Sequence, residues 1–250
     1  MNLILEFFKI NQSVCSAIES HLPQTKVDLN ELYDSIIIDY LNHKNKQNVV
    51  DLGSGRIISY ASKLDPNSKP FFIAIDENLT ELNFNKEADN KIAADLNSEL
   101  PIPNHSADLI TSRYLLEHLQ NPDIFVKNIE KVLKKNGKMI HLFSAKNAPF
   151  ALLNRLLPKS LSQKLLLWLV PNSKDIRGFK THYKLDYHQM IKILQKNGFK
   201  ITKVYLSYYQ SRYFAFFAPF YLLSIIYELI IFKLGLKNLA SYIIIVAHKR

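Results

Sequence analysis

The chain has 250 residues, of which 48% are hydrophobic, and it carries a formal net charge of +10. Its length corresponds to one large domain or a domain with insertions, and its hydrophobic content is sufficient for a buried core. The single cysteine, Cys15, excludes a disulfide framework and favours a reducing compartment, and the first residues do not have the pattern of a signal peptide.

The charge is distributed unevenly along the chain. Residues 1–150 contain 16 Lys and Arg against 19 Asp and Glu, a net charge of −3. Residues 151–250 contain 16 against 3, a net charge of +13. We therefore expect the C-terminal part to meet an anionic partner, such as a membrane surface, a nucleic acid or an acidic substrate, unless the charge only serves solubility.

The apolar pattern predicts strands that alternate with helices. Apolar residues recur every three to four positions in five segments, which predicts helices at 3–20, 29–42, 56–64, 122–134 and 186–198. Short apolar runs predict seven strands, at 48–52, 71–76, 91–96, 106–112, 137–145, 199–207 and 241–249. This alternation is typical of an α/β fold with a parallel sheet covered by helices on both faces.

Two of the six glycines, Gly53 and Gly55, follow the first predicted strand and Asp51. Such a pair allows a sharp turn and lets a ligand approach the backbone, and a helix start beyond it would offer free amide groups. G-x-G alone is weak evidence and can be a mere turn. Its context strengthens it, because Asp76 ends the next strand about 20 residues later, where an acid can bind ribose hydroxyls. In open sheets, ligands bind at these carboxyl ends of strands.

The dinucleotide fingerprint G-x-G-x-x-G is not completed, because Ile58 occupies the position of its third glycine. A dinucleotide is therefore disfavoured. Asp51 and Asp76 instead suit a ligand that carries amine and hydroxyl groups.

Three segments carry a resemblance to a known family: VVDLGSGR, AIDEN and AADLNSELPIPNHSADLITSRYLLEHLQNPDIFVKNIEKVLKKNGKMI. They resemble the core of the class I S-adenosylmethionine-dependent methyltransferases, nearest to the group with ubiquinone/menaquinone and many glycan and lipid methyltransferases. The resemblance is good over residues 47–145 and looser over 180–210. It implies a seven-stranded, mostly parallel, doubly wound Rossmann-like sheet whose last strand is antiparallel. We expect an N-terminal helical cap at 1–46 and a methyltransferase domain at 47–250, with insertions at 149–185 and 213–238.

The resemblance also implies a site for S-adenosylmethionine. The first loop would surround the methionine end, acids after the second strand would hold the ribose hydroxyls, residues after the third would meet the adenine, and residues after the fourth would lie near the methyl group. In chain order these are Asp51, Gly53, Ser54 and Gly55, then Asp76 with Glu77, then Asp95 with the backbone of Leu96, and then Ser112 and Arg113. One departure is Ile57, which stands where the family usually has another glycine. Asp76 could instead cap the next helix, and Asp95 could simply start a turn.

A hydroxyl acceptor must lose a proton, which a histidine or an acid commonly takes. His118 in LLEHL and His182 in FKTHYKLD are the candidates, although both could be structural. Glu117 could lie near the site or be a solvated acid. Phosphate binding is an equally open role for basic residues near His182, namely Arg177, Lys180 and Lys184. No C-x-x-C or H-E-x-x-H motif occurs, so no metal site is predicted.

Two apolar stretches with basic residues among or beside them follow residue 148, at 149–170 and 213–237. The segment from Tyr213 to Phe232 carries one charge, Glu228, and just reaches the length of a membrane span. The strands before and after it must pair in one sheet, which a single crossing would prevent. We therefore predict a helix that lies in the membrane interface, with packing on the sheet or on a second subunit as the alternative.

The sequence thus predicts an S-adenosylmethionine-dependent methyltransferase, peripheral on the cytoplasmic face of a membrane, that O-methylates a lipid, glycolipid or quinone-type acceptor. One alternative is an RNA methyltransferase, which the basic half favours and its leucine-rich stretches disfavour. A further alternative is a membrane-associated scaffold without enzymatic activity.

Overall fold

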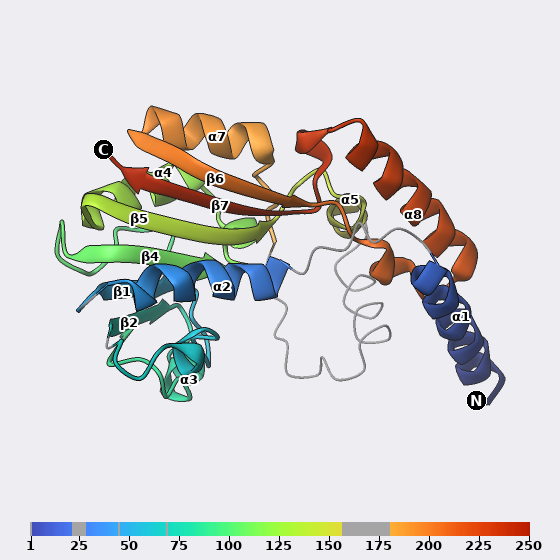
Figure 1. Cartoon of the computed structure of the whole chain (residues 1–250), viewed down its shortest axis with the longest axis horizontal. Helices are drawn as coiled ribbons and strands as arrows, with labels where there is room; N and C mark the ends of the chain where they lie inside the picture. The colour runs from blue at the N-terminus through green and yellow to red at the C-terminus, as the bar shows by residue number, and fades with distance from the viewer. Residues whose placement is uncertain (1, 22–28, 45, 69, 157–180) are drawn as a thin grey trace.

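A computed structural model describes residues 2–21, 29–44, 46–68, 70–156 and 181–250 (Figure 1). Its centre is one seven-stranded sheet with the strand order β3-β2-β1-β4-β5-β7-β6. The strands are β1 (Asn48–Leu52), β2 (Phe71–Asp76), β3 (Asn90–Ala93), β4 (Ala107–Arg113), β5 (Leu133–Ser144), β6 (Phe199–Ser207) and β7 (Tyr242–Lys249). Every predicted strand is present, and β5 begins four residues earlier than predicted.

The strand pairing confirms the mostly parallel sheet. Strands β3, β2, β1, β4 and β5 are parallel to one another, whereas β7 is antiparallel to both β5 and β6. In the register of β1 with β2 and β4, Asp51 stands opposite Ala74 and Thr111. The carboxyl ends of β1, β2 and β4 therefore meet at one edge of the sheet, where ligands bind in folds of this kind.

Helices cover both faces of the sheet, because successive side chains of a strand point to opposite faces and both sets are apolar here. On one face α2 (Leu29–Asn42) buries residues such as Ile37 and Leu41 against Val49 of β1. On the other face α4 (Pro122–Val132) and α7 (Tyr187–Lys196) pack on the second hydrophobic core. Helix α2 thus shares a core with the sheet, and the boundary at residue 46 stays a prediction.

The helix predicted at 56–64, directly after the glycine loop, is not formed. This segment contains only a 3₁₀ turn, η1 (Ala61–Lys63). The predicted helix N-terminus with free amide groups is therefore absent from this position. Two adjacent β-branched residues, Ile57 and Ile58, already lower the helix propensity of this segment.

Contacts with α2 and the sheet hold the segment in its irregular path. The Tyr60 ring is buried, and its hydroxyl lies 2.8 Å from Thr111 Oγ1. Ser59 Oγ and Lys63 Nζ both donate to the Asp34 carboxylate of α2, each at 2.7 Å. These tertiary contacts outweigh the local periodicity, which predicted a helix.

A second group of helices lies at the opposite end of the molecule from β2 and α3 (Leu79–Asn83) (Figure 1). Here α1 (Asn2–His21) packs against α8 (Ala218–Lys233) around a small core of Cys15, Tyr221 and Ile225. Asn11 Oδ1 accepts a hydrogen bond from Ala218 N at 2.9 Å, so a side chain of α1 satisfies an amide at the start of α8.

The two predicted apolar stretches are described in part. The first forms α5 (Pro149–Leu156), and its remainder at 157–170 lies outside the described residues, as do Arg177 and Lys180. The second forms η4 (Ser211–Phe214), α8 and η5 (Lys237–Leu239). Among the helices of the described ranges, none combines the length and the apolar character that a membrane span requires.

Candidate cofactor site

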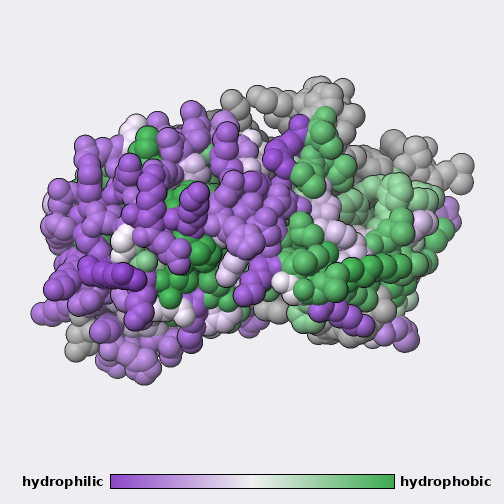
Figure 2. Space-filling view, turned by 90° about the horizontal axis from the view of Figure 1, so that it is seen from above, coloured by the Kyte–Doolittle hydropathy of each residue, from purple (hydrophilic) through white to green (hydrophobic). Residues whose placement is uncertain are grey.

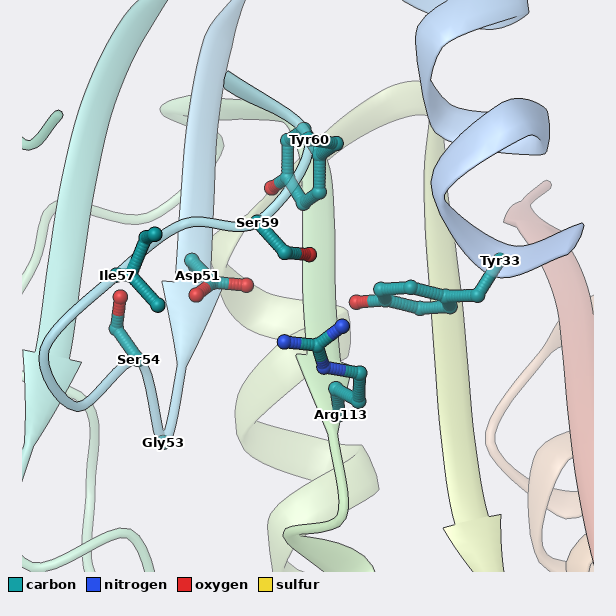
Figure 3. A pocket seen from close by; sticks show the side chains of 8 residues that line it. All are labelled: Tyr33, Asp51, Gly53, Ser54, Ile57, Ser59, Tyr60 and Arg113. Atoms are coloured by element: carbon teal, nitrogen blue, oxygen red, sulfur yellow. The ribbon is translucent and has the colours of Figure 1, made fainter. Parts of the chain in front are cut away.

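A pocket of about 130 Å³ lies where β1 and β4 end (Figure 3). Side chains or backbone from the first loop, the irregular segment after it, α2 and β4 line this pocket. They are Tyr33, Asp51, Gly53, Ser54, Ile57, Ser59, Tyr60 and Arg113. The pocket is therefore located at the sheet edge that the sequence pattern predicts for ligand binding.

The glycine loop requires both of its glycines. Gly53 has φ +67° and Gly55 has φ +55°, a region that residues with a side chain rarely adopt. A Cβ on Gly53 would lie 3.0 Å from Leu115 Cδ1, whereas a Cβ on Gly55 would meet no atom within 4 Å. Gly53 therefore also permits close packing against the segment that follows β4.

Asp51 is a buried acid at the end of β1. Its Oδ1 accepts a hydrogen bond from Thr111 Oγ1 at 2.6 Å. Burial raises the pKa of Asp51 to about 6, although hydrogen bonds from Thr111 and Ser54 and the charge of Arg113 act in the opposite direction. The carboxylate of Asp51 and the guanidinium of Arg113 point into the same space (Figure 3).

Asp76 is held at the end of β2 by two backbone amides. Gly55 N donates to its Oδ2 at 3.0 Å, and Asn78 N donates to its Oδ1 at 2.9 Å. Each oxygen keeps a further lone pair for a ligand hydroxyl. The N-cap of the following helix is Asn78, whose side chain accepts from two amides, so Asp76 does not serve as that cap. Glu77 is exposed beside it.

Asn85 stabilises the glycine loop through two hydrogen bonds. Its Nδ2 donates to Ser54 Oγ at 2.9 Å and to Gly55 O at 3.2 Å, and its side chain is buried. Nothing in the local sequence around Asn85 predicts this contact.

Asp95 and Leu96 follow β3 and lie in a turn. Asp95 is exposed, and its Oδ1 accepts from Asn97 N at 2.9 Å and from Asn97 Nδ2 at 3.0 Å. The hydrogen bond from the backbone of Asn97 is the largest cause that lowers the pKa of Asp95. Asp95 thus starts a turn, which was the alternative to a cofactor role, and its contact with adenine stays a prediction.

The side chain of Ser112 does not line the pocket, and the contact of this residue with the cofactor stays a prediction. Ser112 is fully buried, and its Oγ lies 2.6 Å from Nδ1 of the equally buried His141. Adjacent residues of a strand face opposite sides of the sheet. Arg113 therefore faces the pocket, and Thr111 lies on the same side of β4, where it contacts Asp51. Ser112 faces the layer that contains α4.

The two predicted histidines lie on segments that meet at Glu117. His118 and Glu117 belong to η2 (Leu116–His118), and the backbone amides of His182 and Tyr183 donate to Glu117 O at 2.7 and 3.0 Å. Both histidines are half-buried. Their role as proton acceptors stays a prediction, and the nearby Lys184 is exposed.

Sequence reasoning missed Tyr33, Tyr60 and Thr111. Tyr33 reaches the pocket from α2, and its buried hydroxyl has no hydrogen-bond partner among the residues that the structure describes (Figure 3). A tyrosine on the apolar face of a helix has the same pattern as an ordinary core residue. The sequence around Tyr33 therefore does not indicate that its side chain lines the pocket.

A family model described as a methyltransferase domain matches residues 26–204. The chain belongs to this methyltransferase family. A search of curated protein sequences gives no match.

Solved structures with the same fold share little sequence with the chain. An S-adenosylmethionine-dependent methyltransferase from Mesorhizobium loti is 14% identical with a TM-score of 0.56, covering 86% of this chain and 96% of that one. Geranyl diphosphate C-methyltransferase from Streptomyces coelicolor, in complex with Mg²⁺, geranyl diphosphate and S-adenosylhomocysteine, is 8% identical with a TM-score of 0.59, covering 88% and 81%. A phosphoethanolamine N-methyltransferase from Haemonchus contortus, also with S-adenosylhomocysteine, is 15% identical with a TM-score of 0.54, covering 88% and 52%.

The chain is therefore an S-adenosylmethionine-dependent methyltransferase. The residues at the pocket fit this cofactor, because an amino-acid group carries an ammonium that suits Asp51 and a carboxylate that suits Arg113. Pockets that enclose a whole small molecule measure about 300–1,000 Å³. The pocket would thus accommodate the amino-acid end, while the ribose would extend toward Asp76.

Proposed function

We propose that this methyltransferase acts at the cytoplasmic face of a membrane, where it methylates a hydroxyl group of a lipid, glycolipid or quinone-type acceptor. The observation that carries this proposal is the apolar surface formed by α1 and α8. Figure 2 shows hydrophobic residues gathered at the end of the molecule where α8 lies, whereas the sheet end is mainly hydrophilic.

This apolar surface is large and lies on neighbouring elements. Its exposed side chains come from α1, from α8 and from the turn after α8. They are Phe7, Ile10, Val14, Phe220, Leu222, Leu223, Ile226, Ile230, Phe232, Leu234 and Leu236. Soluble monomers rarely expose an apolar patch larger than a few hundred Å², and larger patches mark interaction sites.

Exposed basic side chains accompany the apolar surface. They are Lys9 of α1, Arg212 of η4, and Lys233 and Lys237 at the end of α8 and beyond it. Each basic residue near an anionic leaflet contributes about 1 kcal/mol, and buried apolar area contributes about 25 cal/mol per Å². An anionic membrane surface therefore satisfies both kinds of side chain.

The topology of the sheet favours binding in the interface over a crossing. Strands β6 and β7, which precede and follow α8, are hydrogen-bonded neighbours from Phe199 to Ser207. Both ends of the connecting segment are consequently on one side of any bilayer. Helix α8 would lie along the membrane surface with its exposed apolar residues in the interface.

The reaction at the pocket depends mainly on positioning, which can supply several kcal/mol to a displacement. Bound S-adenosylmethionine supplies an electrophilic methyl group on sulfur. Asp51 and Arg113 would hold its amino-acid end, and Asp76 would bind its ribose hydroxyls. The acceptor oxygen would then attack the methyl carbon after its proton has moved to a base.

Vesicle binding tests the membrane part of the proposal. Native protein should sediment with vesicles of anionic phospholipid, and high salt should release only part of it, because salt does not screen the apolar contribution. A variant with Phe220→Ser, Leu223→Ser, Ile230→Ser and Phe232→Ser should stay in solution. A matched control with Phe71→Ser and Ile124→Ser, two exposed apolar residues of the sheet end, should bind as the native protein does.

Label transfer tests the acceptor. Radiolabelled cofactor and a fractionated membrane extract should give label in the lipid fraction. Label in RNA alone, or native protein that ignores the vesicles, would contradict the proposal. The affinity of each variant for S-adenosylhomocysteine, measured by calorimetry, should equal that of the native protein, since the changes lie far from the pocket along the chain.

A further inference from the structure

Glu117 is a buried acid with one unused oxygen. Only 5% of the residue is exposed. Ser144 Oγ donates to its Oε1 at 2.8 Å, while its buried Oε2 has no hydrogen-bond partner among the described residues. Leaving a buried acceptor unpaired is unfavourable, so an atom of this kind in a native protein calls for an explanation, of which a ligand is one.

Two tyrosines with unusual backbone conformations flank Glu117. Tyr114 has φ 55° and Tyr183 has φ 45°. The backbone amide of Tyr183 donates to Glu117 O, and Tyr114 precedes Glu117 by three residues. Positive φ in a bulky residue is strained, and such strain is concentrated at active sites and ligand clamps.

Further aromatic rings extend this environment. Phe150 stacks on Tyr213 with 4.7 Å between ring centroids, and on Tyr242 with 5.4 Å. Tyr114 meets Tyr242 edge to face at 6.1 Å, and the hydroxyls of Tyr213 and Tyr242 lie 2.8 Å apart. We refer to Tyr114, Tyr183, Tyr213 and Tyr242, together with Phe150, as the tyrosine cluster.

Electrostatics place Glu117 beside this cluster. Burial is the main cause that raises the pKa values of Tyr114, Tyr183 and Tyr213, and the negative charge of Glu117 adds to it in each case. All three tyrosines therefore remain neutral across the physiological pH range. Burial also raises the pKa of Glu117 itself to about 7.

The tyrosine cluster is connected to the cofactor pocket through the end of β4. Arg113 lines the pocket, and Tyr114 is the next residue. Leu115 lies so close to the glycine loop that a Cβ on Gly53 would be only 3.0 Å from it. Glu117 follows two residues later, so the acid belongs to the same five-residue segment, 113–117, that lines the pocket through Arg113 and approaches the glycine loop through Leu115.

We propose that the methyl acceptor is a phenol that binds at the tyrosine cluster, and that Glu117 accepts the proton of its hydroxyl group through Oε2. This assignment rests on the hydroxyl methylation proposed above. The proton passes from the acceptor oxygen to the carboxylate, and that oxygen bonds to the methyl carbon as the sulfur–methyl bond breaks, with its electron pair remaining on sulfur. The products are the methyl ether, S-adenosylhomocysteine and a protonated Glu117, which returns its proton to solvent.

The acidity of the acceptor decides between phenols and aliphatic hydroxyls. A phenol such as the tyrosine side chain has a pKa of about 10, so its proton transfer to Glu117 is unfavourable by a factor of about 10³. An aliphatic hydroxyl resembles water, whose pKa is about 15.7, and the factor becomes more than about 10⁸. Aromatic side chains also pack well against an aromatic ring. A quinol-type ring has both a sufficiently acidic hydroxyl group and an aromatic ring that packs on the tyrosine cluster, whereas a sugar hydroxyl lacks the acidity.

A spectroscopic titration tests the contact without turnover. The probe is 4-cyanophenol, whose neutral and ionised forms absorb at different wavelengths, added in the presence of S-adenosylhomocysteine. Above pH 7 the ionised Glu117 should repel the phenolate, so the pKa of the bound probe should be at least one unit higher in the native protein than in Glu117→Gln. The exposed Glu99→Gln should behave as native. Equal probe pKa values in native protein and Glu117→Gln would overturn the assignment.

The pH profile of turnover gives a second measure. The titratable side chains that face Glu117 are Tyr114, Tyr183 and Tyr213, which do not titrate near pH 7, and His118 and His182 lie on the adjoining backbone. The low-pH limb of kcat/KM near pH 7 should disappear in Glu117→Gln, with kcat reduced about 10²–10⁴-fold. It should persist in His118→Gln and His182→Gln, and move to higher pH in Ser144→Ala, which removes a hydrogen bond that lowers the Glu117 pKa.

The outcomes separate this inference from the proposed function. If Glu117→Gln labels the lipid fraction as fast as native protein and keeps the low-pH limb of kcat/KM, the assignment of Glu117 is wrong while lipid methylation stands. If the probe shift is present but no label enters lipid, the phenol site stands and the lipid acceptor is wrong. Thermal unfolding and S-adenosylhomocysteine affinity of Glu117→Gln should match the native values, which excludes loss of the fold as the cause.

Discussion

The sheet end and the α1–α8 end of the molecule bury their residues very differently. At the sheet end, two large hydrophobic cores fill both faces of the sheet, and acids such as Asp76 have backbone amides on both carboxylate oxygens. At the other end, α1 and α8 enclose three buried core residues and expose many apolar side chains. The sheet end is therefore organised around an internal site, whereas the α1–α8 end presents its apolar residues outward.

Glu228 ties the α1–α8 end to the sheet. It is the one charged residue within the apolar run of α8, and it is 1% exposed. Its Oε1 accepts from Gln210 N at 2.8 Å and from Ser211 N at 2.5 Å, the residues that follow β6. The single acid of this apolar segment thus holds the turn that leads into α8.

Of the variants that we consider, Glu228→Leu should have the largest effect, and it should destabilise the α1–α8 end more than the sheet end. The change leaves two buried backbone amides without an acceptor, at about 1–3 kcal/mol each. We expect the free energy of unfolding to fall by about 2–5 kcal/mol, and hydrogen exchange to accelerate in α8 and η4 before it does in the sheet. Glu228→Gln, which keeps an acceptor oxygen, should lose less. Equal exchange protection in α8 of the Leu variant and the native protein would show that the hydrogen bonds of Glu228 do not stabilise this end.

Asp51→Asn should act on the sheet end alone. The amide keeps the shape of the side chain but loses the charge that would pair with the cofactor ammonium, so we expect a loss of about 1.5–3 kcal/mol or roughly 10–100-fold in affinity. Stability should not fall, because the charged form of this acid is disfavoured by burial. Calorimetry with S-adenosylhomocysteine and urea unfolding measure the two quantities. Vesicle binding should be unchanged, and a parallel loss of vesicle binding would mean that the two ends are coupled.

The same acid predicts a pH dependence of cofactor affinity. The pKa of Asp51 is about 6 in the folded chain, above its ordinary value of 3.8, so the folded state binds this proton more tightly than the unfolded one. The cost of the buried charge is thus present above pH 6 and is relieved as the pH falls from about 6 to 4. Cofactor binding needs the charged form, so affinity should fall about tenfold per pH unit below pH 6, or about 1.4 kcal/mol.

Two variants check the origin of that slope. Asp51→Asn should bind weakly with no slope between pH 5 and 7. Asp95→Asn should keep the native slope, because hydrogen bonds from Asn97 lower the pKa of Asp95 and it does not titrate in this range. A slope that survives in Asp51→Asn would assign the titration to another group.

The sheet could be predicted from the sequence because its strands are buried on both faces and therefore appear as continuous apolar runs. The turn at the glycine loop was also predictable, since Gly53, Gly55 and the acids at the ends of β1 and β2 have fixed positions relative to their strands, while their contacts with the cofactor stay predictions. Tertiary contacts decided the rest. The helix expected at 56–64 gave way to the contacts of Ser59 and Lys63 with Asp34, and no local pattern reports a partner 25 or more residues away.

Ser112 and Arg113 show what a resemblance alone does not resolve. It placed both residues near the methyl group, although they are neighbours on one strand. In the structure Ser112 Oγ lies 2.6 Å from His141 Nδ1, whereas Arg113 lines the pocket. Adjacent residues of a strand point to opposite faces of the sheet, so the two side chains do not both enter the pocket.

The smallest effect that we predict is the difference between alanine substitutions at the two glycines of the cofactor loop. Gly53→Ala and Gly55→Ala both place a Cβ on a residue with positive φ, at a cost of about 1–2 kcal/mol. Only the Cβ on Gly53 would also meet Leu115, with Cδ1 at 3.0 Å and Cβ at 3.3 Å, so either Leu115 or the loop must move. Gly53→Ala should therefore destabilise the chain more than Gly55→Ala in urea unfolding, and it should also weaken S-adenosylhomocysteine binding. The additional change Leu115→Ala removes Cδ1, the nearest of these atoms, and leaves only Cβ at 3.3 Å, so it should bring Gly53→Ala back toward the cofactor affinity of Gly55→Ala. If the double variant binds no better than Gly53→Ala alone, the close packing between the glycine loop and the segment after β4 does not control the pocket.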